Sequence, residues 1–530
     1  MAKRPVNQLK FGAVLSYASL AMGVIVSLVY TPIMLRQLGE SEFGVYNTVL
    51  PIVSYLNLLS FGLGSAYTRF YSRFKVADDK EGVARLNGLF LTIYAILGAA
   101  VLVIGSIIAA GMPQLLASSA LTEPEIALAQ KLMYILTVNA AVAFPISVFE
   151  SHVMVNEQYL FQKIVAIGKT VLNPLIMIPL LLCGFRSVTM VCLTLFFTLL
   201  SGTLNILYCL KHLKMSFRFG RFDRGLVKEM FGYTFYIFIG ILVDQINWSM
   251  DRLILTGVGS VPIAIYTIGS QLEQYYTTMS TTFSGLLTPR VHRMVSAGSS
   301  NEELSALFIR VGRIQFLLMS MILLGFAAVG RPFAVCWGGG EAYEVSYLIA
   351  LALFIPALFP AIQTLGIEIQ RAKNMHKFRS FVYLGVAIGN LILSIPLCKL
   401  FASLGERYMS STYGAEYAGI FAGLGCAVGT ALAVLIGNVL LMNWYYHKHI
   451  GLDIPAFWRS ILRMLPGILP PAAVAIAIAL WAPMRNSYVD VLLWGGLFVI
   501  VYLLSVWLLS MNREEKDLVL RPLQRLFKQK

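Results

Sequence analysis

Apolar stretches of membrane-spanning length alternate with short polar segments along the whole sequence. About fourteen such runs occur, near residues 11–35, 43–67, 86–112, 127–153, 161–184, 187–211, 229–256, 262–288, 306–330, 345–369, 378–401, 416–443, 461–482 and 489–511. A helix needs about 20 apolar residues to cross the hydrocarbon core. The runs lack the short alternation of transmembrane β-strands. The pattern therefore predicts an all-α polytopic membrane protein with about fourteen transmembrane helices.

Composition supports a membrane protein and excludes a large soluble domain. Hydrophobic residues make up 58% of the chain and charged residues 13%, whereas about a quarter of an ordinary soluble domain is charged. The longest connections run to about twenty residues, the length of a linker or a surface helix. The cysteines show no CxxC pair and no metal-type spacing, so we expect neither a metal site nor a cofactor. The cysteines are Cys183, Cys192, Cys209, Cys336, Cys398 and Cys426.

The basic residues predict the orientation. If both termini are cytoplasmic, most of the 41 lysines and arginines fall in inner segments, as expected for inner loops. The exceptions are Arg252, which lies within an apolar run, and the outer residues Arg36, Lys131, Arg186, Arg331, Lys399, Arg407 and Arg485. We therefore expect a multi-pass protein with cytoplasmic N- and C-termini. Because the positive charge is spread over all inner loops, it does not indicate nucleic acid binding.

The two halves of the chain resemble each other. A shift of 220 residues without gaps aligns the first two helices of each half, pairing Gly39 with Gly259, Tyr46 with Tyr266 and Arg73 with Arg293. An even number of helices separates the copies, which predicts parallel repeats about an axis along the membrane normal. Chance matching among apolar segments is the alternative.

This repeat predicts the domain organisation. We expect two pseudo-symmetric six-helix lobes, 1–215 and 216–445, that face each other across a central cavity. A third segment, 446–530, would contain two appended helices and a cytoplasmic tail.

Polar residues are concentrated in the repeated helix pairs, which we expect to line this cavity. In run 229–256, four polar residues follow helical spacing and share one face, namely Asp244, Asn247, Trp248 and Asp251. The predicted substrate-binding residues are Arg69, Arg252, Asn47, Asn57, Asn247, Trp248 and Gln271.

Charges within the span cost about 2.5–3.5 kcal/mol each on insertion scales, so they indicate function. We expect Arg69 and Arg252 to attract an anionic headgroup, because arginine suits phosphate. Asp244, Asp251 and Glu273 would bind a coupling proton or cation. The alternative is that Asp244 or Asp251 forms a structural ion pair with Arg252.

Three short motifs resemble a known family. Tyr30-Thr-Pro-Ile-Met-Leu-Arg-Gln-Leu-Gly39, Glu40-Ser-Glu-Phe-Gly-Val-Tyr46 and Phe61-Gly-Leu-Gly64 are similar to the opening of bacterial polysaccharide flippases. These are the O-antigen-type exporters of the multidrug/oligosaccharidyl-lipid/polysaccharide (MOP) superfamily. Asp251-Arg-Leu-Ile-Leu255, with Gly259 and Tyr266 downstream, similarly resembles their seventh and eighth helices. The resemblance covers most of the first 300 residues.

This resemblance implies a MATE/MOP-like, two-lobed flippase in a bacterial cytoplasmic membrane. It would move undecaprenyl-diphosphate-linked oligosaccharide outward by alternating access, for cell-surface polysaccharide biosynthesis. Membrane lipids, a coupling H⁺ or Na⁺ and polysaccharide-assembly proteins are the expected partners. The appended helices resemble those of lipid II flippases. Because the sequence shows no Walker motif, we expect an ion gradient or the membrane potential to supply the energy.

Other functions remain open. A lipid II-type flippase or a multidrug exporter of the same superfamily is one alternative, although a cationic drug would favour an acidic cavity over Arg69 and Arg252. A membrane-embedded glycosyltransferase or polymerase is another. That class would place paired carboxylates on a large outer loop, whereas Asp78-Asp79 falls in a predicted cytoplasmic loop. His447 and His449 are interpreted as inner-loop charge rather than as a metal site.

Overall fold

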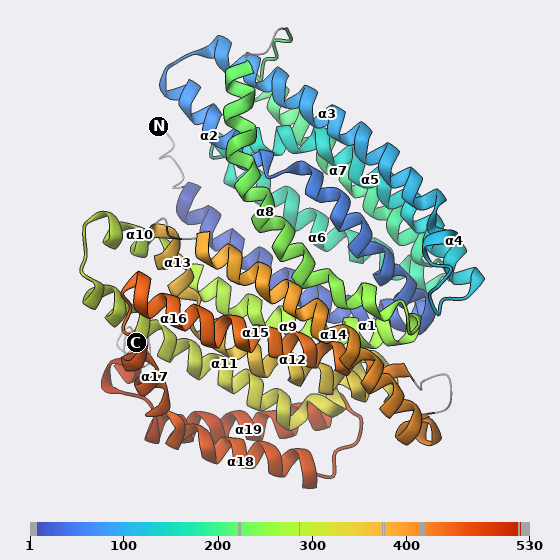
Figure 1. Ribbon diagram of the computed structural model, residues 1–530, viewed down its shortest axis with the longest axis vertical. Coiled ribbons are helices and arrows are strands. Elements are labelled where there is room, and N and C mark those ends of the chain that lie inside the picture. Colours follow the sequence, from blue (N-terminus) through green and yellow to red (C-terminus); the bar gives the residue numbers. More distant parts are fainter. Residues whose placement is uncertain are drawn as a thin grey trace, which may run out of the picture. The chain divides into compact units, whose positions relative to one another are not determined.

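Among the described residues, the regular elements of the computed structural model are all helices (Figure 1). The structure describes residues 8–220, 224–285, 287–373, 375, 377–413, 419–517 and 520. Two compact units divide the chain, residues 1–264 and 265–530. The all-helical prediction is confirmed.

Ten helices among the described residues are long and apolar enough to cross a membrane. The number rises to eleven if the bent pair Ile454–Leu462 and Leu465–Trp481 is one span. One candidate, Met22–Val76, contains the predicted run 43–67 and the second part of the predicted run 11–35, which the sequence predicts as separate helices. The helices Arg224–Leu255 and Ser260–Gly285 are not among the ten. The chain is therefore an all-helical membrane protein with 10–11 candidate spans, and the count of fourteen stays a prediction.

Unit 1 contains eight helices among the described residues. They are α1 (Gln8–Asn57), α2 (Leu63–Val76), α3 (Lys80–Ala110), α4 (Met112–Leu115), α5 (Glu123–Val155), α6 (Tyr159–Leu182), α7 (Ser187–Lys211) and α8 (Arg224–Leu255), with a short 3₁₀ turn at Leu58–Ser60. Within α1, Gly39 has φ 78° and ψ 168°, which breaks the helix in two. Residues with a Cβ rarely adopt this backbone conformation, so glycine suits the turn between two predicted helices.

The core of unit 1 holds a buried polar cluster between α2, α3 and α5. The Tyr67 hydroxyl donates a hydrogen bond to Asn87 Oδ1 at 2.7 Å and lies 2.7 Å from His152 Nδ1. All three side chains are buried. Because an unsatisfied polar group in the core is costly, the cluster fixes the three helices against one another.

Unit 2 begins within α9 (Ser260–Gly285) and contains the remaining helices. These are α10 (Thr288–Ser296), α11 (Asn301–Gly338), α12 (Glu344–Ile362), α13 (Thr364–Ala372), α14 (Lys377–Tyr413), α15 (Ala422–Val434), α16 (Asn443–Tyr445), α17 (Ile454–Leu462), α18 (Leu465–Trp481) and α19 (Tyr488–Leu509). Two π-helical segments, Leu435–Met442 and Tyr446–Ile450, flank α16, and a 3₁₀ turn at Glu341–Tyr343 precedes α12.

The two halves share a local backbone feature at the paired glycines. Gly39 and Gly259 both have positive φ, at 78° and 144°, and each precedes a long helix. A short helix follows in each half, α2 and α10, with Arg73 and Arg293 in their last turns. The division between the two compact units falls between residues 264 and 265, so α8 belongs to unit 1. The six-helix lobes 1–215 and 216–445 and the segment 446–530 stay predictions.

The appended helices α18 and α19 pack against α11. Gly312 of α11 lets the Phe457 ring approach closely, because a Cβ at position 312 would lie 2.3 Å from Phe457 Cε2. Further along α11, the Ser320 hydroxyl lies 2.8 Å from the Tyr502 hydroxyl, which donates a hydrogen bond to Leu317 O at 2.7 Å. Small and polar residues thus hold the C-terminal pair in place.

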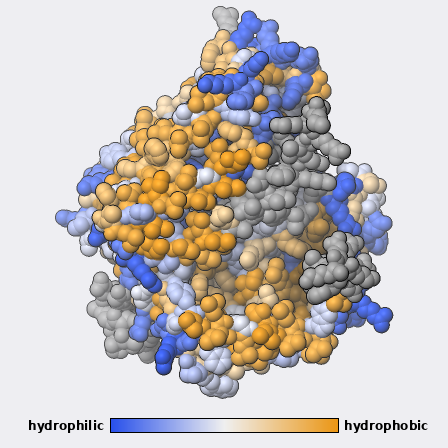
Figure 2. Space-filling view, turned by 180° about the vertical axis from the view of Figure 1, so that it is seen from behind, coloured by the Kyte–Doolittle hydropathy of each residue, from blue (hydrophilic) through white to orange (hydrophobic). Residues whose placement is uncertain are grey.

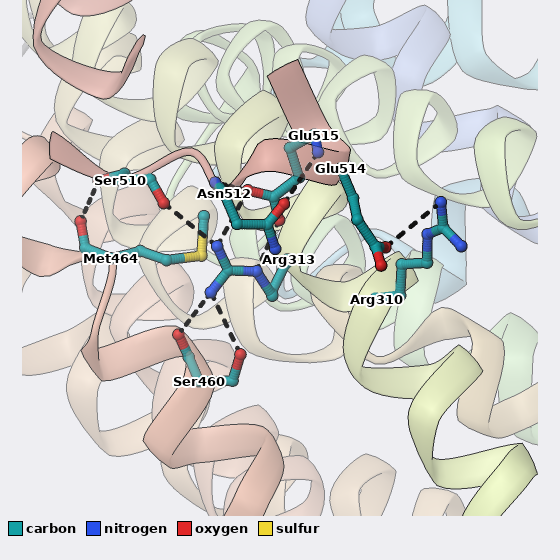
Figure 3. Close-up of polar contacts among 8 residues, drawn as sticks. All are labelled: Arg310, Arg313, Ser460, Met464, Ser510, Asn512, Glu514 and Glu515. Atoms are coloured by element: carbon teal, nitrogen blue, oxygen red, sulfur yellow. Dashed lines mark hydrogen bonds and ion pairs between the residues drawn. The ribbon is translucent and has the colours of Figure 1, made fainter. Parts of the chain in front are cut away.

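A buried arginine completes the attachment of the C-terminal segment (Figure 3). Arg313 of α11 forms a two-pronged ion pair with Glu515, with Nε 2.6 Å and Nη2 2.9 Å from the two carboxylate oxygens. Its guanidinium also donates to the backbone oxygens of Ser460 and Ser510. The two side chains are only 12% and 4% exposed. Such a pair is specific, since bidentate geometry and further hydrogen bonds satisfy both charges.

Apolar side chains cover much of the face of the molecule seen in Figure 2. On α18 and α19, Trp481 is 79% exposed, Leu492 75% and Leu508 72%. Large exposed apolar patches are rare on proteins that live in water. The surface therefore agrees with a protein surrounded by lipid.

Arg313→Ala tests whether this ion pair anchors the C-terminal segment. We expect it to lower the free energy of unfolding by about 3–5 kcal/mol, because Glu515 would remain buried without its partner. The neighbouring Arg310 lies 3.5 Å from Glu514, with side chains 50% and 69% exposed. Arg310→Ala should change stability by about 0–1 kcal/mol. Thermal unfolding of both variants in one detergent measures the difference, and equal midpoints would contradict the anchoring role.

Candidate functional site

A polar seam joins α1 and α8 within unit 1. The Ser249 hydroxyl of α8 lies 3.1 Å from the Tyr55 hydroxyl of α1 and accepts a hydrogen bond from Gln245 Nε2 at 3.1 Å. Nearby, the rings of Phe61 and Phe238 lie 4.8 Å apart. Two helices that the sequence singled out for their polar residues therefore pack side by side.

Three of the predicted site residues on α1 and α8, namely Asn47, Asn247 and Asp251, are buried or half-buried. Asn47 is buried, and its amide donates to the Phe43 carbonyl at 2.8 Å. Asn247 similarly donates to the Val243 carbonyl at 3.1 Å. Bonds of this kind use an amide donor within its own helix. Asp251 is only 4% exposed, so a carboxylate is buried at the same end of α8 as Arg252.

The other predicted residues of unit 1 are more exposed than Asn47 and Asp251, or their side chains lie outside the described residues. Asn57 is exposed at the last position of α1, and Arg69 is exposed on α2. Arg252 is half-buried and directly follows Asp251, so the two side chains leave α8 in different directions. The side chains of Asp244 and Trp248 lie outside the described residues. Of the four residues that share the polar face of α8, the structure therefore describes the side chains of Asn247 and Asp251.

Gln271 and Glu273 lie on α9 in unit 2. The Gln271 amide donates to the Tyr275 hydroxyl at 2.7 Å, and Glu273 is half-buried. Threonine hydroxyls of α9 bond back to its own carbonyls, as with Thr278 to Gln274 at 2.6 Å. This internal bonding lets a polar helix lose contact with water at reduced cost. The central cavity and the roles of all ten residues stay predictions.

A carboxylate that the sequence reasoning missed joins three segments of unit 1. Glu125, in the first turn of α5, accepts hydrogen bonds from Ser41 at 2.6 Å and Ser260 at 2.5 Å. It also accepts from the Thr122 backbone at 2.8 Å, as part of a capping box. The Thr-Glu-Pro-Glu pattern at 122–125 signals the helix start, but nothing in the sequence reveals Ser41 or Ser260 as partners.

Gly44 allows the closest approach in this region. A Cβ at position 44 would lie 2.0 Å from the Ser260 carbonyl oxygen, so only glycine lets α1 pass the start of α9. Glu42, two residues earlier, forms an ion pair with Arg186 at 3.0 Å and accepts from the Ser187 backbone at 2.9 Å. The motif around residues 40–46 therefore has a packing role in this structure.

Comparison with known families identifies the chain. Residues 12–295 match the family described as polysaccharide biosynthesis protein, and this range is more than half of the sequence. The chain belongs to the polysaccharide biosynthesis protein family. No curated protein matches the sequence. The resemblance that the motifs predicted is confirmed at the level of the family.

Solved structures similar to this family member are transporters. "Lipid II flippase MurJ, inward closed conformation" has a TM-score of 0.68 at 15% identity, covering 97% of this chain and 99% of that chain. An inward-facing multidrug resistance MATE family transporter of the MOP superfamily has a TM-score of 0.63 at 15% identity, covering 84% and 99%. A MOP superfamily transporter from Pyrococcus furiosus has a TM-score of 0.54 at 15% identity, covering 84% and 96%.

These similarities establish the fold. The protein is a multi-pass membrane protein with the MATE/MurJ-like fold of MOP superfamily transporters. The match to the MurJ structure covers 97% of this chain. The segment 446–530 is much longer than the part of the chain that stays uncovered. The match to MurJ therefore extends into the appended helices.

Gly44→Ala tests the packing role of the motif. We expect a loss of about 1–3 kcal/mol of stability, because the added methyl group must push α1 away from Ser260. Gly23→Ala is the matched control, since nothing lies within 4 Å of a Cβ at that position of the same helix. Thermal unfolding in detergent compares the two. A Gly44→Ala protein as stable as the Gly23→Ala protein would show that the close approach is unimportant.

Proposed function

We propose that this protein transfers an undecaprenyl-diphosphate-linked oligosaccharide across the cytoplasmic membrane for cell-surface polysaccharide biosynthesis. The family match over residues 12–295 carries the proposal, because it assigns the chain to polysaccharide biosynthesis. The MOP transporter fold supports movement of a substrate rather than chemistry on it.

The chemistry of such a substrate suits the polar residues of this chain. A polyprenyl tail can stay in lipid, whereas its diphosphate and sugars cannot cross hydrocarbon unaided. We infer that Arg69 and Arg252 attract the diphosphate, since guanidinium groups bind phosphate oxygens in pairs. The amides of Asn47, Asn57 and Asn247 would offer hydrogen bonds to sugar hydroxyls. Trp248 would stack on a sugar ring, and Gln271 would add a further amide.

Transport against a gradient needs a source of energy. We infer that Asp244, Asp251 and Glu273 bind a coupling proton or cation, because carboxylates within apolar segments are costly to insert into a membrane and therefore indicate a function. Alternating access between the predicted lobes would then expose the polar path to one side at a time. The resemblance to bacterial polysaccharide flippases implies that the movement is outward.

Reconstituted vesicles test this proposal directly. A lipid-linked oligosaccharide with a nitrobenzoxadiazole label on its sugar is bleached by dithionite only where the headgroup faces the outside. We expect the protein to make the inner pool accessible faster than protein-free vesicles do. Arg252→Gln and Asp251→Asn should each slow this transfer at least about tenfold, which corresponds to about 1.4 kcal/mol in the barrier.

Controls separate the site from general damage. Lys131 is exposed on α5 and belongs to no predicted site, so Lys131→Gln should transfer at the native rate. Arg252→Lys keeps the charge and should retain part of the activity. Native transfer by the Arg252→Gln and Asp251→Asn proteins would refute the site. No transfer above that of empty vesicles, or export of a lipophilic cation instead, would refute the substrate.

A further inference from the structure

A basic pocket of about 810 Å³ lies in unit 1 where α2 ends and α3 and α8 begin. Arg73, Arg85 and Arg218 line it together with Glu81 and Glu229. The predicted orientation places this end of the unit at the cytoplasmic surface. The pocket is separate from the polar residues assigned above to transport.

Among the described residues that line this pocket, positive charge is in excess. Arg73 pairs with Glu229 at 3.2 Å, while Arg218 and Arg85 share the single carboxylate of Glu81, with Arg85 3.9 Å away. The three arginine side chains are 65%, 57% and 60% exposed. Exposed pairs of this kind contribute little to stability, so the guanidinium groups can turn toward an incoming anion at small cost.

The backbone positions Arg218 independently of its ion pair. The segment 213–220 lies against α3, where the Arg218 amide donates to the Ala84 carbonyl at 2.9 Å. The Asn87 side chain donates to the Ser216 carbonyl at 2.9 Å. At Gly88 a Cβ would lie 2.4 Å from the Arg218 carbonyl oxygen, so the segment touches the helix directly. One wall of the pocket is therefore an irregular backbone segment that hydrogen bonds hold against α3.

A shallow and largely open apolar groove of about 410 Å³ adjoins the pocket along α3. Leu91, Ala95, Ile96 and Ala99 line it, and Phe219 borders both the groove and the basic pocket. Ile96 and Phe219 are 63% and 61% exposed. The two alanines are smaller than Leu91 and Ile96, which line the groove beside them. A charged headgroup site thus adjoins a trough of hydrocarbon character.

We propose that this pocket and groove bind one anionic glycerophospholipid of the membrane. Arg73, Arg85 and Arg218 hold its phosphate, and an acyl chain lies along α3 beside Phe219. Arginine forms paired hydrogen bonds with phosphate oxygens, and basic pockets on the cytoplasmic side of transmembrane helices suit acidic headgroups. The site needs no assumption about the transported substrate. The bound lipid links the 213–220 segment to the beginnings of α3 and α8.

Lipid retention in nanodiscs tests the proposal. The full-length protein is purified from discs of phosphatidylcholine with and without phosphatidylglycerol, and native mass spectrometry measures the lipid that stays bound. We expect phosphatidylglycerol to be held at least about tenfold more tightly than phosphatidylcholine. The Arg85→Gln/Arg218→Gln double variant should lose this preference. Lys211→Gln is the matched control, because Lys211 is exposed at the end of α7 and lies outside the pocket.

A variant of the groove separates a lipid from a free phosphate. Ala95→Trp fills the groove and leaves all the ion pairs in place, so it should weaken phosphatidylglycerol retention severalfold. This variant also decides the matter if the double variant does not fold in phosphatidylcholine. Equal retention of the two lipids by the native protein would overturn the proposal. So would displacement of phosphatidylglycerol by inorganic phosphate together with an Ala95→Trp protein that behaves like the native one.

Discussion

Hydrocarbon offers no hydrogen-bond partner, and most of the features of this chain follow from that constraint. Backbone groups are satisfied inside helices, so the described elements are helical. Side-chain donors follow the same rule. Asn47 and Asn247 bond to carbonyls of their own helices, as do threonines of α9. The one charge that α11 buries near the C-terminal segment, Arg313, meets Glu515 and two backbone oxygens. These polar side chains therefore lie where other groups of the protein form hydrogen bonds with them.

The sequence predicts the helices well because their signal is local. The apolar runs 11–35 and 43–67 and the break between them follow from residue types within one segment, and the helix breaks there at Gly39. The motifs identify the family for the same reason, since each motif is a short run of neighbouring residues. The exact number of spans is harder to predict. α9 carries so many polar residues that hydropathy separates it poorly from a surface helix.

Contacts between distant residues could not be predicted in this way. Glu125 and Ser260 are joined by a hydrogen bond although 135 positions separate them, and Arg313 and Glu515 are 202 positions apart. Periodicity describes one helix face and carries no information about the helix that will cover it. Gly44 shows the limit most clearly. Its place in a family motif is visible in the sequence, whereas its contact with the Ser260 carbonyl requires the fold.

α8 connects the two proposals made for this protein. Its first residues border the basic pocket that we assign to an anionic phospholipid. Its last turns carry Asp251 and Arg252, which we assign to coupling and to the substrate diphosphate. Between them, Ser249 holds the helix to Tyr55 of α1. A lipid at one end and a substrate at the other would thus act on the same helix.

Analysis of lipid-linked sugars in cells tests the transport function most directly. The gene is deleted in the source organism, and undecaprenyl-diphosphate-linked oligosaccharides are extracted and measured by mass spectrometry alongside surface polysaccharide. The proposed flippase predicts that the lipid-linked units accumulate and the surface polysaccharide is lost. The native gene should reverse both effects, and Arg252→Gln should not. Unchanged lipid-linked pools with normal surface polysaccharide would contradict the proposed function.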